Sequence, residues 1–528
     1  MQKHTLQPVA LQERIRTIDI IRGLALFGIL TINFTVDDGQ VSPEEGWTSF
    51  GNQLVWWSVR LFMDDRFQTI FCLLFGLGFA IQLQRAADRN APFAFLFIRR
   101  MIALYLIGIA MQIFTGIGYG VISWYAMVGV LLLLFWKVPV KFLPVLAVFF
   151  FLFTWTRDIV VTVRNESEIK SLLKQTTKVD STILERYAGV FENVQKVRLI
   201  FIRKGDTLIG EGPGRRFLLT PLSDSHFIRK DLKHILTFKK DSSGKLNKLE
   251  VKVPDGRIIQ NNRVNTDLQQ ALAKQLSNRS NSQKKDEKPS YQQFISKNST
   301  NVWNNIKNFS FKNFFWHRNV FPIGYLLVVF LFGAFLGRSK ILHDVASNKN
   351  FLSNMFKWGV IIGGAGIVAY IGLDAWSQFK GFKWISYPFW LRTIIEPFWS
   401  ACIILMALGY ISGIALLAEK ESWKKRLSIP ATIGRLGLTN YIFHAVAYVL
   451  ILENFVFTLG LYGKIGPLFR LLFAIVAYMI MYIFSRWWLK YFKYGPFEWL
   501  WRSLTYLKFQ PMRLKQPDKA EEKEDGNI

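Results

Sequence analysis

The residues best suited to chemistry in this chain lie within or beside long apolar stretches. His444 is the only histidine well inside such a stretch, and it follows Asn440 by four residues, which puts both side chains on one face of a helix. An imidazole in an apolar setting can act as a general base or relay a proton. It can equally be a hydrogen-bonded structural residue, so both interpretations stay open.

Asp19, Arg22 and Asn33 lie along the first apolar stretch. Asp19 and Arg22 are three residues apart, so they share a helix face and either form a local ion pair or present the guanidinium to a phosphate. Asn33 lies near the other end of the stretch. Its amide can hydrogen-bond a thioester carbonyl or a developing oxyanion, or it can bond a neighbouring helix.

Asp65 and Arg435 are charged positions next to later apolar stretches. Asp65 lies between Asp64 and Arg66. It either acts as a base toward an acceptor hydroxyl, or this charged cluster caps the helix that follows and pairs within itself. Arg435 is expected at the cytoplasmic end of the same helix as His444, and it either binds phosphate or anchors the headgroup region. Walker, Rossmann, zinc-ligand and Gly-x-Ser-x-Gly motifs are absent, so ATP-driven transport and soluble-type hydrolysis lack support and no metal is expected.

Ten apolar stretches must position these residues. About 20 apolar residues span the ~30 Å hydrocarbon core of a bilayer, and the stretches approach that length when ragged ends are allowed. They are Leu24–Phe34, Phe67–Leu83, Phe95–Phe114, Val121–Phe135, Phe142–Thr154, Val320–Leu336, Trp358–Leu373, Trp390–Leu417, Leu438–Phe455 and Leu468–Phe484. Together with 51% hydrophobic residues, they predict a polytopic α-helical membrane protein of about ten transmembrane helices.

A polar, basic segment divides the apolar stretches into two groups of five. We therefore predict an N-terminal transmembrane bundle (1–156), an extracytoplasmic insert (157–318), a C-terminal transmembrane bundle (319–486) and a cytoplasmic tail (487–528). The tail is aromatic and basic, as expected of an amphipathic segment at the membrane interface.

Within the insert, the pattern changes to short alternating runs separated by turn residues, which is typical of strands. The predicted strands are Val197–Ile202, Asp206–Gly210, Phe217–Pro221, His234–Phe238 and Leu246–Val253. They indicate an antiparallel barrel-like β domain over about 181–262, followed by a polar linker over about 263–300. The domain either binds an acceptor or an anionic envelope polymer, or it serves packing and assembly without a ligand.

The placement of charge predicts an orientation. The net charge is +29, and lysines and arginines gather in alternate short loops, whereas the loop Asp37–Glu45 is acidic. The basic loops hold Arg14, Arg16, Arg85, Arg89, Arg99, Arg100, Lys137, Lys141, Arg338, Lys340, Lys420, Lys424, Lys425 and Arg426. Because such loops stay in the cytoplasm, we predict cytoplasmic termini and an insert outside. The lipid bilayer explains this charge better than nucleic acid, so no nucleic-acid partner is expected.

Four segments resemble one family of bacterial membrane proteins. "RTIDIIRGLALFGILTINF" and "RFQTIFCLLFGLGFAIQLQRA" resemble its first two spans, and "ATIGRLGLTNYIFHA" and "YGPFEWLWRSLTYLKFQPMR" resemble its C-terminal half. This is the YeiB-like family, also called domain-of-unknown-function family 418. In the insert, "ERYAGVFEN", "LTPLSDSHF" and "HILTFKKDSSGKLNKLEV" resemble a lipocalin-like β module, which implies a small antiparallel barrel.

The YeiB-like family is similar to a wider set of transmembrane acyltransferases that includes the lysosomal heparan-sulfate acetyltransferase. The resemblance implies that an acyl group passes from acyl-CoA on the cytoplasmic side to an acceptor on the other side. Asp19, Arg22, Gly23 and Asn33 match the first span of that set. In the heparan-sulfate enzyme, an Asn at the match of Asn33 and a His about a dozen residues later are implicated in transfer.

This chain departs from the family pattern at two places. No histidine occurs between His4 and His226, so the histidine that should follow Asn33 is absent. Gly120 also stands where the pattern usually has an Asp, shortly before a Tyr-Ala pair. Transfer by the family's route therefore lacks two of its expected groups.

Three functions are compatible with these features. The leading hypothesis is an acyltransferase of the bacterial inner membrane, which moves an acyl group from cytoplasmic acetyl-CoA or another acyl-CoA to an envelope carbohydrate, lipid or small metabolite outside. The expected donor-binding residues are Arg22, Arg435 and Asp19, and the expected catalytic residues are His444, Asn33 and Asp65. The alternatives are a transporter or exporter of a small anionic solute and a non-catalytic envelope scaffold. The chain acts either alone or as an oligomer.

Overall fold

The computed structural model describes most of the chain. The described residues are 14–36, 47–90, 92–116, 121–173, 179–193, 197–212, 216–229, 234–241, 244–253, 258–273, 290–307, 323–379, 389–453, 458–461 and 464–514. The chain forms two compact units. The helical unit comprises Met1–Phe151, Pro289–Asn298 and Ile323–Ile528, and the barrel unit comprises Leu152–Lys288 and Ser299–Pro322.

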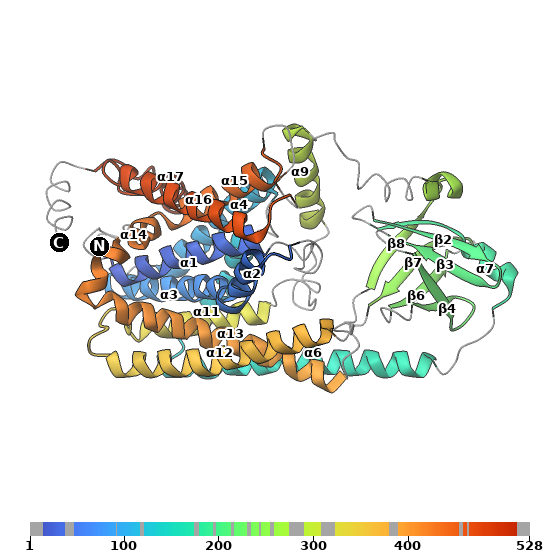
Figure 1. The fold of residues 1–528 in the computed structure, drawn as a ribbon, viewed down its shortest axis with the longest axis horizontal. Helices are drawn as coiled ribbons and strands as arrows, with labels where there is room; N and C mark the ends of the chain where they lie inside the picture. Colours follow the sequence, from blue (N-terminus) through green and yellow to red (C-terminus); the bar gives the residue numbers. More distant parts are fainter. Residues whose placement is uncertain are drawn as a thin grey trace. The chain divides into compact units, whose positions relative to one another are not determined.

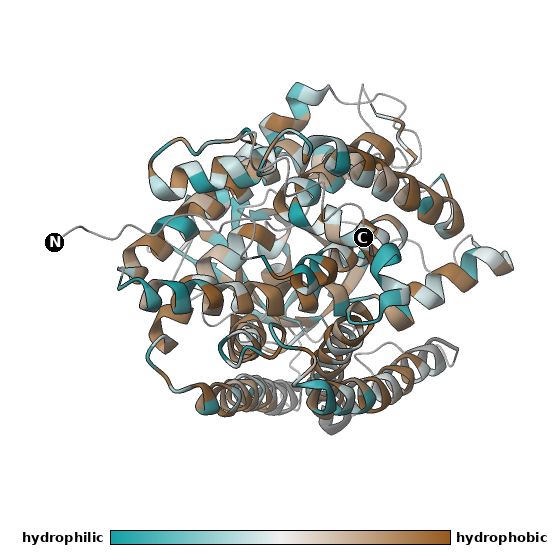
Figure 2. Cartoon of the chain, turned by 90° about the vertical axis from the view of Figure 1, so that its left-hand side faces the viewer, coloured by the Kyte–Doolittle hydropathy of each residue, from teal (hydrophilic) through white to brown (hydrophobic). Residues whose placement is uncertain are grey.

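Helices make up the helical unit (Figure 1). In chain order they are α1 (Arg16–Thr35), α2 (Phe50–Phe62), α3 (Arg66–Asp88), α4 (Phe93–Thr115), α5 (Val121–Leu131), the 3₁₀ turns η4 (Leu132–Phe135) and η5 (Val140–Phe142), the start of α6 (Leu143–Leu173), the start of α9 (Tyr291–Lys307), α11 (Ile323–Arg338), α12 (Lys349–Phe379), α13 (Phe389–Ala418), α14 (Glu421–Arg435), α15 (Gly437–Leu452), α16 (Pro467–Trp488) and α17 (Pro496–Tyr506). The long helices are mainly brown in Figure 2, so they are apolar along most of their length.

Each of the ten predicted apolar stretches coincides with a helix, but not all of these helices are long. Six helical segments of the described chain are long and apolar enough to cross a membrane. They are Arg16–Thr35, Phe50–Asp88, Phe93–Thr115, Lys349–Leu373, Ile394–Ala418 and Pro467–Trp488. The pair α14 and α15 makes a seventh candidate, bent by 84°, and three further apolar helices are shorter. The described part of the chain therefore has about six clear candidates for membrane-spanning helices.

Glycines permit a close contact between α3 and α11. A Cβ atom at Gly76 of α3 would lie 2.0 Å from the carbonyl oxygen of Phe330 in α11. The reverse contact is equally tight, since a Cβ at Gly333 would lie 2.0 Å from the carbonyl oxygen of Leu73. Only glycine permits backbones to approach this closely. By contrast, a Cβ at Gly78 would meet no atom within 4 Å, so this glycine opens space instead.

The barrel unit contains a closed antiparallel barrel of eight strands. The strands are β1 (Gly189–Asn193), β2 (Arg198–Lys204), β3 (Thr207–Glu211), β4 (Arg216–Pro221), β5 (His226–Arg229), β6 (His234–Lys240), β7 (Leu246–Lys252) and β8 (Ile258–Val264). Each strand pairs with the next one, and β8 pairs with β1, with Phe191 opposite Arg263. The five predicted strands correspond to β2, β3, β4, β6 and β7, and the predicted antiparallel barrel is confirmed.

Aromatic side chains fill the inside of the barrel. Phe238 packs against Phe191, Phe201 and Phe227 with ring centroids 5.4–5.6 Å apart. The short helix α7 (Ser181–Tyr187) precedes β1 and adds Tyr187, which stacks on Phe238 at 4.5 Å. Because these rings are buried and in contact, they form a packed core.

Two helices depart from the predicted domain boundaries. α6 continues without a break to Leu173, well past the predicted start of the insert at 157. α9 begins at Tyr291, inside the segment predicted to be a polar linker. Its first residues bind the C-terminal end of α4, because the Tyr291 hydroxyl donates to the Phe114 carbonyl at 3.1 Å and the Asn298 amide donates to Ile113 at 3.3 Å.

Candidate functional site

A cavity of about 380 Å³ lies within the helical unit. Its walls come from α1, α3, α4, α5, α14, α15 and α17, together with the segment that precedes α1. The cavity extends along α3 from Gln68 to Arg85, which is about 26 Å at 1.5 Å per residue. That length approaches the ~30 Å thickness of a hydrocarbon core. The cavity therefore extends along most of α3.

One end of the cavity is rich in arginine. Its walls there include Arg14, Arg22, Arg85, Arg100, Arg435 and Arg502. The two carboxylates in the lining are Asp19 and Glu498, so the formal excess is four positive charges. We call this group of eight residues the arginine end. Arginine forks match phosphate geometry, so the arginine end is suited to a polyphosphate group.

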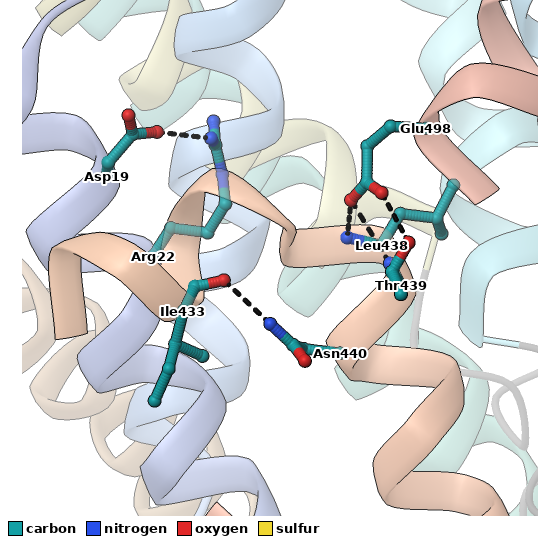
Figure 3. Close-up of polar contacts among 7 residues, drawn as sticks. All are labelled: Asp19, Arg22, Ile433, Leu438, Thr439, Asn440 and Glu498. Atoms are coloured by element: carbon teal, nitrogen blue, oxygen red, sulfur yellow. Dashed lines mark hydrogen bonds and ion pairs between the residues drawn. The ribbon is translucent and has the colours of Figure 1, made fainter. Parts of the chain in front are cut away.

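Arg22 is held in place by an ion pair and by a glycine. Its Nη1 donates to Asp19 Oδ1 at 3.0 Å, and Figure 3 shows the two side chains facing each other. A Cβ at Gly437 would lie 2.6 Å from Arg22 Cδ, so the guanidinium passes over the start of α15 only because that residue has no side chain. The predicted pair of Asp19 and Arg22 is thus present, and both residues line the cavity.

Arg435 also lines the cavity, but it is not on the helix that holds His444. The expectation that one helix carries both residues is wrong, because α14 ends at Arg435 and α15 starts at Gly437 after a bend of 84°. Arg435 occupies the last turn of α14, where a positive charge interacts favourably with the helix dipole. His444 lies about 10 Å along α15 from Gly437.

The break between α14 and α15 is bridged by side chains (Figure 3). Asn440 Nδ2 donates to the Ile433 carbonyl of α14 at 2.9 Å. Glu498 accepts from the backbone N–H groups of Leu438 at 2.6 Å and Thr439 at 3.1 Å. These contacts satisfy groups that a broken helix leaves without intrahelical partners.

Aromatic and cationic side chains of α17 complete the arginine end. The Arg100 guanidinium lies 3.9 Å from the centroid of the Trp501 ring, and the Trp501 indole donates to the Arg100 carbonyl at 2.9 Å. Arg502 lies over Tyr494 at 4.3 Å. Burial lowers the pKa of the Arg502 guanidinium, and the positive charge of Arg14 lowers it further. Both effects are expected where cations are held together away from water.

Asn33 and His444 meet at the opposite end of the cavity. Asn33 Nδ2 lies 2.7 Å from His444 Nε2, and His444 Nδ1 lies 3.0 Å from the Tyr441 carbonyl oxygen. A carbonyl can only accept, so Nδ1 carries the proton and Nε2 accepts a hydrogen bond from the Asn33 amide. His444 is 1% exposed, and Asn33 is the member of the pair that lines the cavity. Gln68, Tyr125 and Tyr441 line this end as well.

Asp65 is not part of the cavity lining. It is the N-cap residue of α3 in a left-handed conformation with φ of 60°, and its side chain makes no capping hydrogen bond. The neighbouring Arg66 does donate to the Asp64 carbonyl within the predicted cluster. Asp65 lies one helical turn before Gln68, which does line the cavity. The next residue, Arg66, is fully buried, donates to the Arg60 carbonyl at 2.8 Å and lies 4.9 Å from the Trp399 ring.

Several lining residues were not predicted as site residues from the sequence. Arg14, Arg85 and Arg100 were counted only as loop charges, and Glu498, Trp501 and Arg502 only as parts of a C-terminal motif. The available signal was the position of these arginines at the ends of apolar stretches. Among the described residues, no three His, Cys, Asp or Glu side chains gather as a metal ion would require.

Comparisons with protein families match two parts of the chain. Residues 14–172 match the family described as heparan-alpha-glucosaminide N-acetyltransferase, catalytic. Residues 336–508 match the family described as protein of unknown function DUF418. All the helices that line the cavity lie within these two matches.

Curated relatives are similar over different lengths. Uncharacterized protein YxaH of Bacillus subtilis (strain 168) is 24% identical over 97% of this chain and 99% of its own length. Uncharacterized protein YeiB of Escherichia coli (strain K12) is 30% identical over 33% of this chain and 42% of its own. An uncharacterized 39.9 kDa protein of Bacillus acidopullulyticus is 35% identical over 21% of this chain and 31% of its own.

No solved structure gives a significant match to the chain. The predicted resemblance is confirmed by the two family matches and by the relatives. The chain is similar to the YeiB-like proteins, with a DUF418 match over residues 336–508 and an acetyltransferase-catalytic match over residues 14–172.

Proposed function

We propose that this protein is a transmembrane acyltransferase that moves an acyl group from a cytoplasmic acyl-CoA to an acceptor outside. The observation that carries the proposal is the cavity, which joins the arginine end to the pair of Asn33 and His444. The family match of residues 14–172 supports the same reaction class. The acceptor belongs to the cell envelope, as a carbohydrate, a lipid or a small metabolite.

The dimensions of the cavity suit a donor of this kind. Coenzyme A carries several phosphate groups and a long flexible arm that ends in the thioester. The phosphates would bind at the arginine end, where the formal excess is four positive charges. Arg22 and Asn33 are eleven residues apart on α1, which is about 17 Å. The flexible arm of coenzyme A is about as long as five extended amino-acid residues, at ~3.5 Å each, so it covers that distance.

The transfer step uses the two residues at the far end. The acceptor oxygen or nitrogen attacks the thioester carbonyl, the carbon–sulfur bond breaks, and the coenzyme leaves as a thiolate. Asn33 lines the cavity and can donate a hydrogen bond to the developing oxyanion. When the Asn33 amide turns to the substrate, its hydrogen bond to His444 Nε2 is broken. His444 Nε2 can then take the proton that the acceptor loses.

His444 also compensates for the missing histidine of the family pattern. The expected position, about a dozen residues after Asn33, holds no histidine. His444 comes from α15, which is far away in sequence, and contacts Asn33 at 2.7 Å. The proposal therefore assigns the role of the missing imidazole to a residue from the C-terminal half.

The membrane arrangement follows from the loop charges. The six clear spans, the bent pair and the three shorter apolar helices would together make ten crossings. With the basic loops in the cytoplasm, both termini lie inside, the barrel unit lies outside, and the arginine end opens toward the cytoplasm. A bacterial inner membrane then gives the donor and the acceptor access from opposite sides.

Binding and transfer can be tested on the purified full-length protein. Acetyl-CoA is titrated by calorimetry, and transfer is followed by the release of free thiol and by the appearance of radiolabelled acetate in envelope fractions. His444→Ala should retain donor binding and lose transfer on the order of a thousandfold. Absence of acetyl-CoA binding at millimolar concentration would rule out the proposed donor.

His444→Gln separates the two roles of the histidine. Glutamine can keep one hydrogen bond to Asn33 but cannot take a proton at neutral pH. If His444→Gln transfers at the wild-type rate, the imidazole only positions Asn33, and the proposed base is wrong.

A second candidate is an exporter of a small anionic solute. The observation that favours it is the length of the cavity, which reaches about 26 Å along α3 between polar ends. Proteoliposomes distinguish the two functions. Acetyl-CoA that yields thiol and a labelled acceptor indicates transfer, whereas an unchanged anion that accumulates across the membrane indicates export.

A further inference from the structure

The segment Trp487–Leu514, here called the C-terminal collar, is ordered by contacts within itself. The Trp499 indole donates to the Gln510 carbonyl at 2.8 Å, and Trp499 stacks on Phe509 with centroids 5.8 Å apart. Leu507 turns the chain at the end of α17 with a left-handed φ of 51°. The last residues then return to the start of the collar, because Leu514 N donates to the Tyr491 carbonyl at 3.1 Å. The collar is thus an ordered part of the structure.

The two sides of α17 differ in what they contact. Glu498, Trp501 and Arg502 line the cavity. Leu500 and Leu504 are 37% and 41% exposed, and at 3.6 residues per turn they lie on the opposite side of the helix. Beyond the helix, Leu507 and Phe509 are 74% and 81% exposed. One short helix therefore joins an exposed apolar surface to the arginine end.

The exposed charged residues of the collar are basic. Lys490, Lys508 and Arg513 are exposed in the collar. The only acidic residue of the collar is Glu498, which is engaged with the start of α15. Exposed Leu and Phe side chains with basic residues around them are typical of segments that bind at the headgroup boundary of an anionic leaflet. Exposed Tyr491 and Trp487 suit the same depth.

We propose that the C-terminal collar docks on anionic phospholipid headgroups, and that this docking holds α17 in the position that completes the arginine end. The bilayer supplies both halves of the contact, since acyl chains accept the exposed apolar side chains and phosphate groups pair with the three cations. The first part of the proposal concerns the lipid contact alone. The second part, the effect on donor binding, rests on the proposed function.

Lipid selectivity tests the first part without any donor. The full-length protein is equilibrated with equal amounts of phosphatidylglycerol and phosphatidylcholine, and the retained lipids are counted by native mass spectrometry. The variant K490Q/K508Q/R513Q should lose preference for phosphatidylglycerol by at least about tenfold, since each basic residue near an anionic surface contributes roughly fivefold. The control variant K204Q/K240Q/K245Q removes three exposed lysines of the barrel and should keep the preference. Equal selectivity in the two variants would overturn the docking.

Donor affinity tests the second part. Acetyl-CoA should bind the wild-type protein several-fold more tightly in phosphatidylglycerol nanodiscs than in phosphatidylcholine nanodiscs, and the collar variant should show no such difference. If lipid selectivity is lost while acetyl-CoA affinity stays the same, the collar docks but does not shape the arginine end. If no nanodisc gives acetyl-CoA binding, the proposed function fails and the docking result stands.

Discussion

The helical unit and the barrel unit use their interiors in opposite ways. Inside the barrel, Phe191, Phe201, Phe227 and Phe238 are buried against one another. Inside the helical unit, a cavity of about 380 Å³ separates the arginine end from Asn33. Chemistry is therefore expected in the helical unit, because a reaction needs space and polar groups while a packed aromatic core provides stability. Four predictions test this contrast between the two interiors.

The largest effect is expected from Phe238→Ala in the barrel. Removing a ring with four aromatic neighbours should destabilise the barrel by about 4 kcal/mol, roughly a thousandfold in its unfolding equilibrium. Hydrogen exchange of β1–β8 in the full-length protein measures this, with α1 and α3 as internal references. Leu218→Ala, at a residue 65% exposed, is the matched control and should change little. Equal protection in the two variants would mean that the barrel is not held by its aromatic core.

Gly78→Leu should close the cavity. A Cβ at Gly78 meets no atom within 4 Å, and the residue lines the cavity, so a leucine side chain begins in open space and extends into the donor's path. We expect acetyl-CoA affinity to fall about a hundredfold, or roughly 3 kcal/mol, without loss of fold. Gly364→Leu is the control, since that position on α12 is equally open and lies outside the cavity lining. Unchanged affinity in Gly78→Leu would show that the donor does not use this space.

Arg22→Gln should weaken acetyl-CoA binding about tenfold, because a charge-assisted bond to phosphate is worth roughly 1.5–3 kcal/mol. The loss should shrink as salt is raised from low to physiological concentration. Asp19→Asn should act in the other direction, since it removes a negative charge 3.0 Å from the Arg22 guanidinium. Calorimetry at several salt concentrations measures all three effects. A weaker affinity in Asp19→Asn would mean that Asp19 mainly orients Arg22.

The smallest expected effect is a pH dependence of the stability of the barrel. Burial raises the pKa of the Tyr187 hydroxyl, and the carboxylate of Asp224 raises it further. Unfolded tyrosine has a pKa of about 10, so the neutral form is favoured in the folded barrel and its stabilisation is complete below that pH. The stabilisation should be lost as pH rises above about 10. Tyr187→Phe should flatten this dependence, and an equally steep loss in that variant would assign the effect to other groups.

The sequence predicted the elements better than their assembly. All ten apolar stretches became helices, because long apolar runs have no other way to satisfy their backbones in lipid. Three strands of the barrel were missed. β5 has only four residues, and β8 (IIQNNRV) turns Asn261 into the barrel, so neither strand shows the usual alternation. The structure satisfies Asn261 with the carbonyls of Leu249 and Ile259, a contact that no local pattern predicts.

The candidate site was also partly predictable from the sequence. Polar residues in apolar stretches are visible in a sequence, and Asp19, Arg22, Asn33, Arg435 and His444 all belong to the cavity or contact its lining. Their partners are not visible, because Asn33 and His444 lie 411 positions apart. The break at Leu436 was also hidden, since Ile433 and Asn440 join the two helices through a hydrogen bond that only the folded chain forms.

The capping of α15 by α17 makes the two helices depend on each other for their stability. Thr439 accepts from the Phe497 backbone N–H at 3.2 Å and donates to Glu498, so the starts of the two helices are completed by each other. Movement of α17 away from α15 would open the start of α15 and would remove Glu498, Trp501 and Arg502 from the cavity lining. The two helix starts are therefore expected to open together, as one cooperative unit.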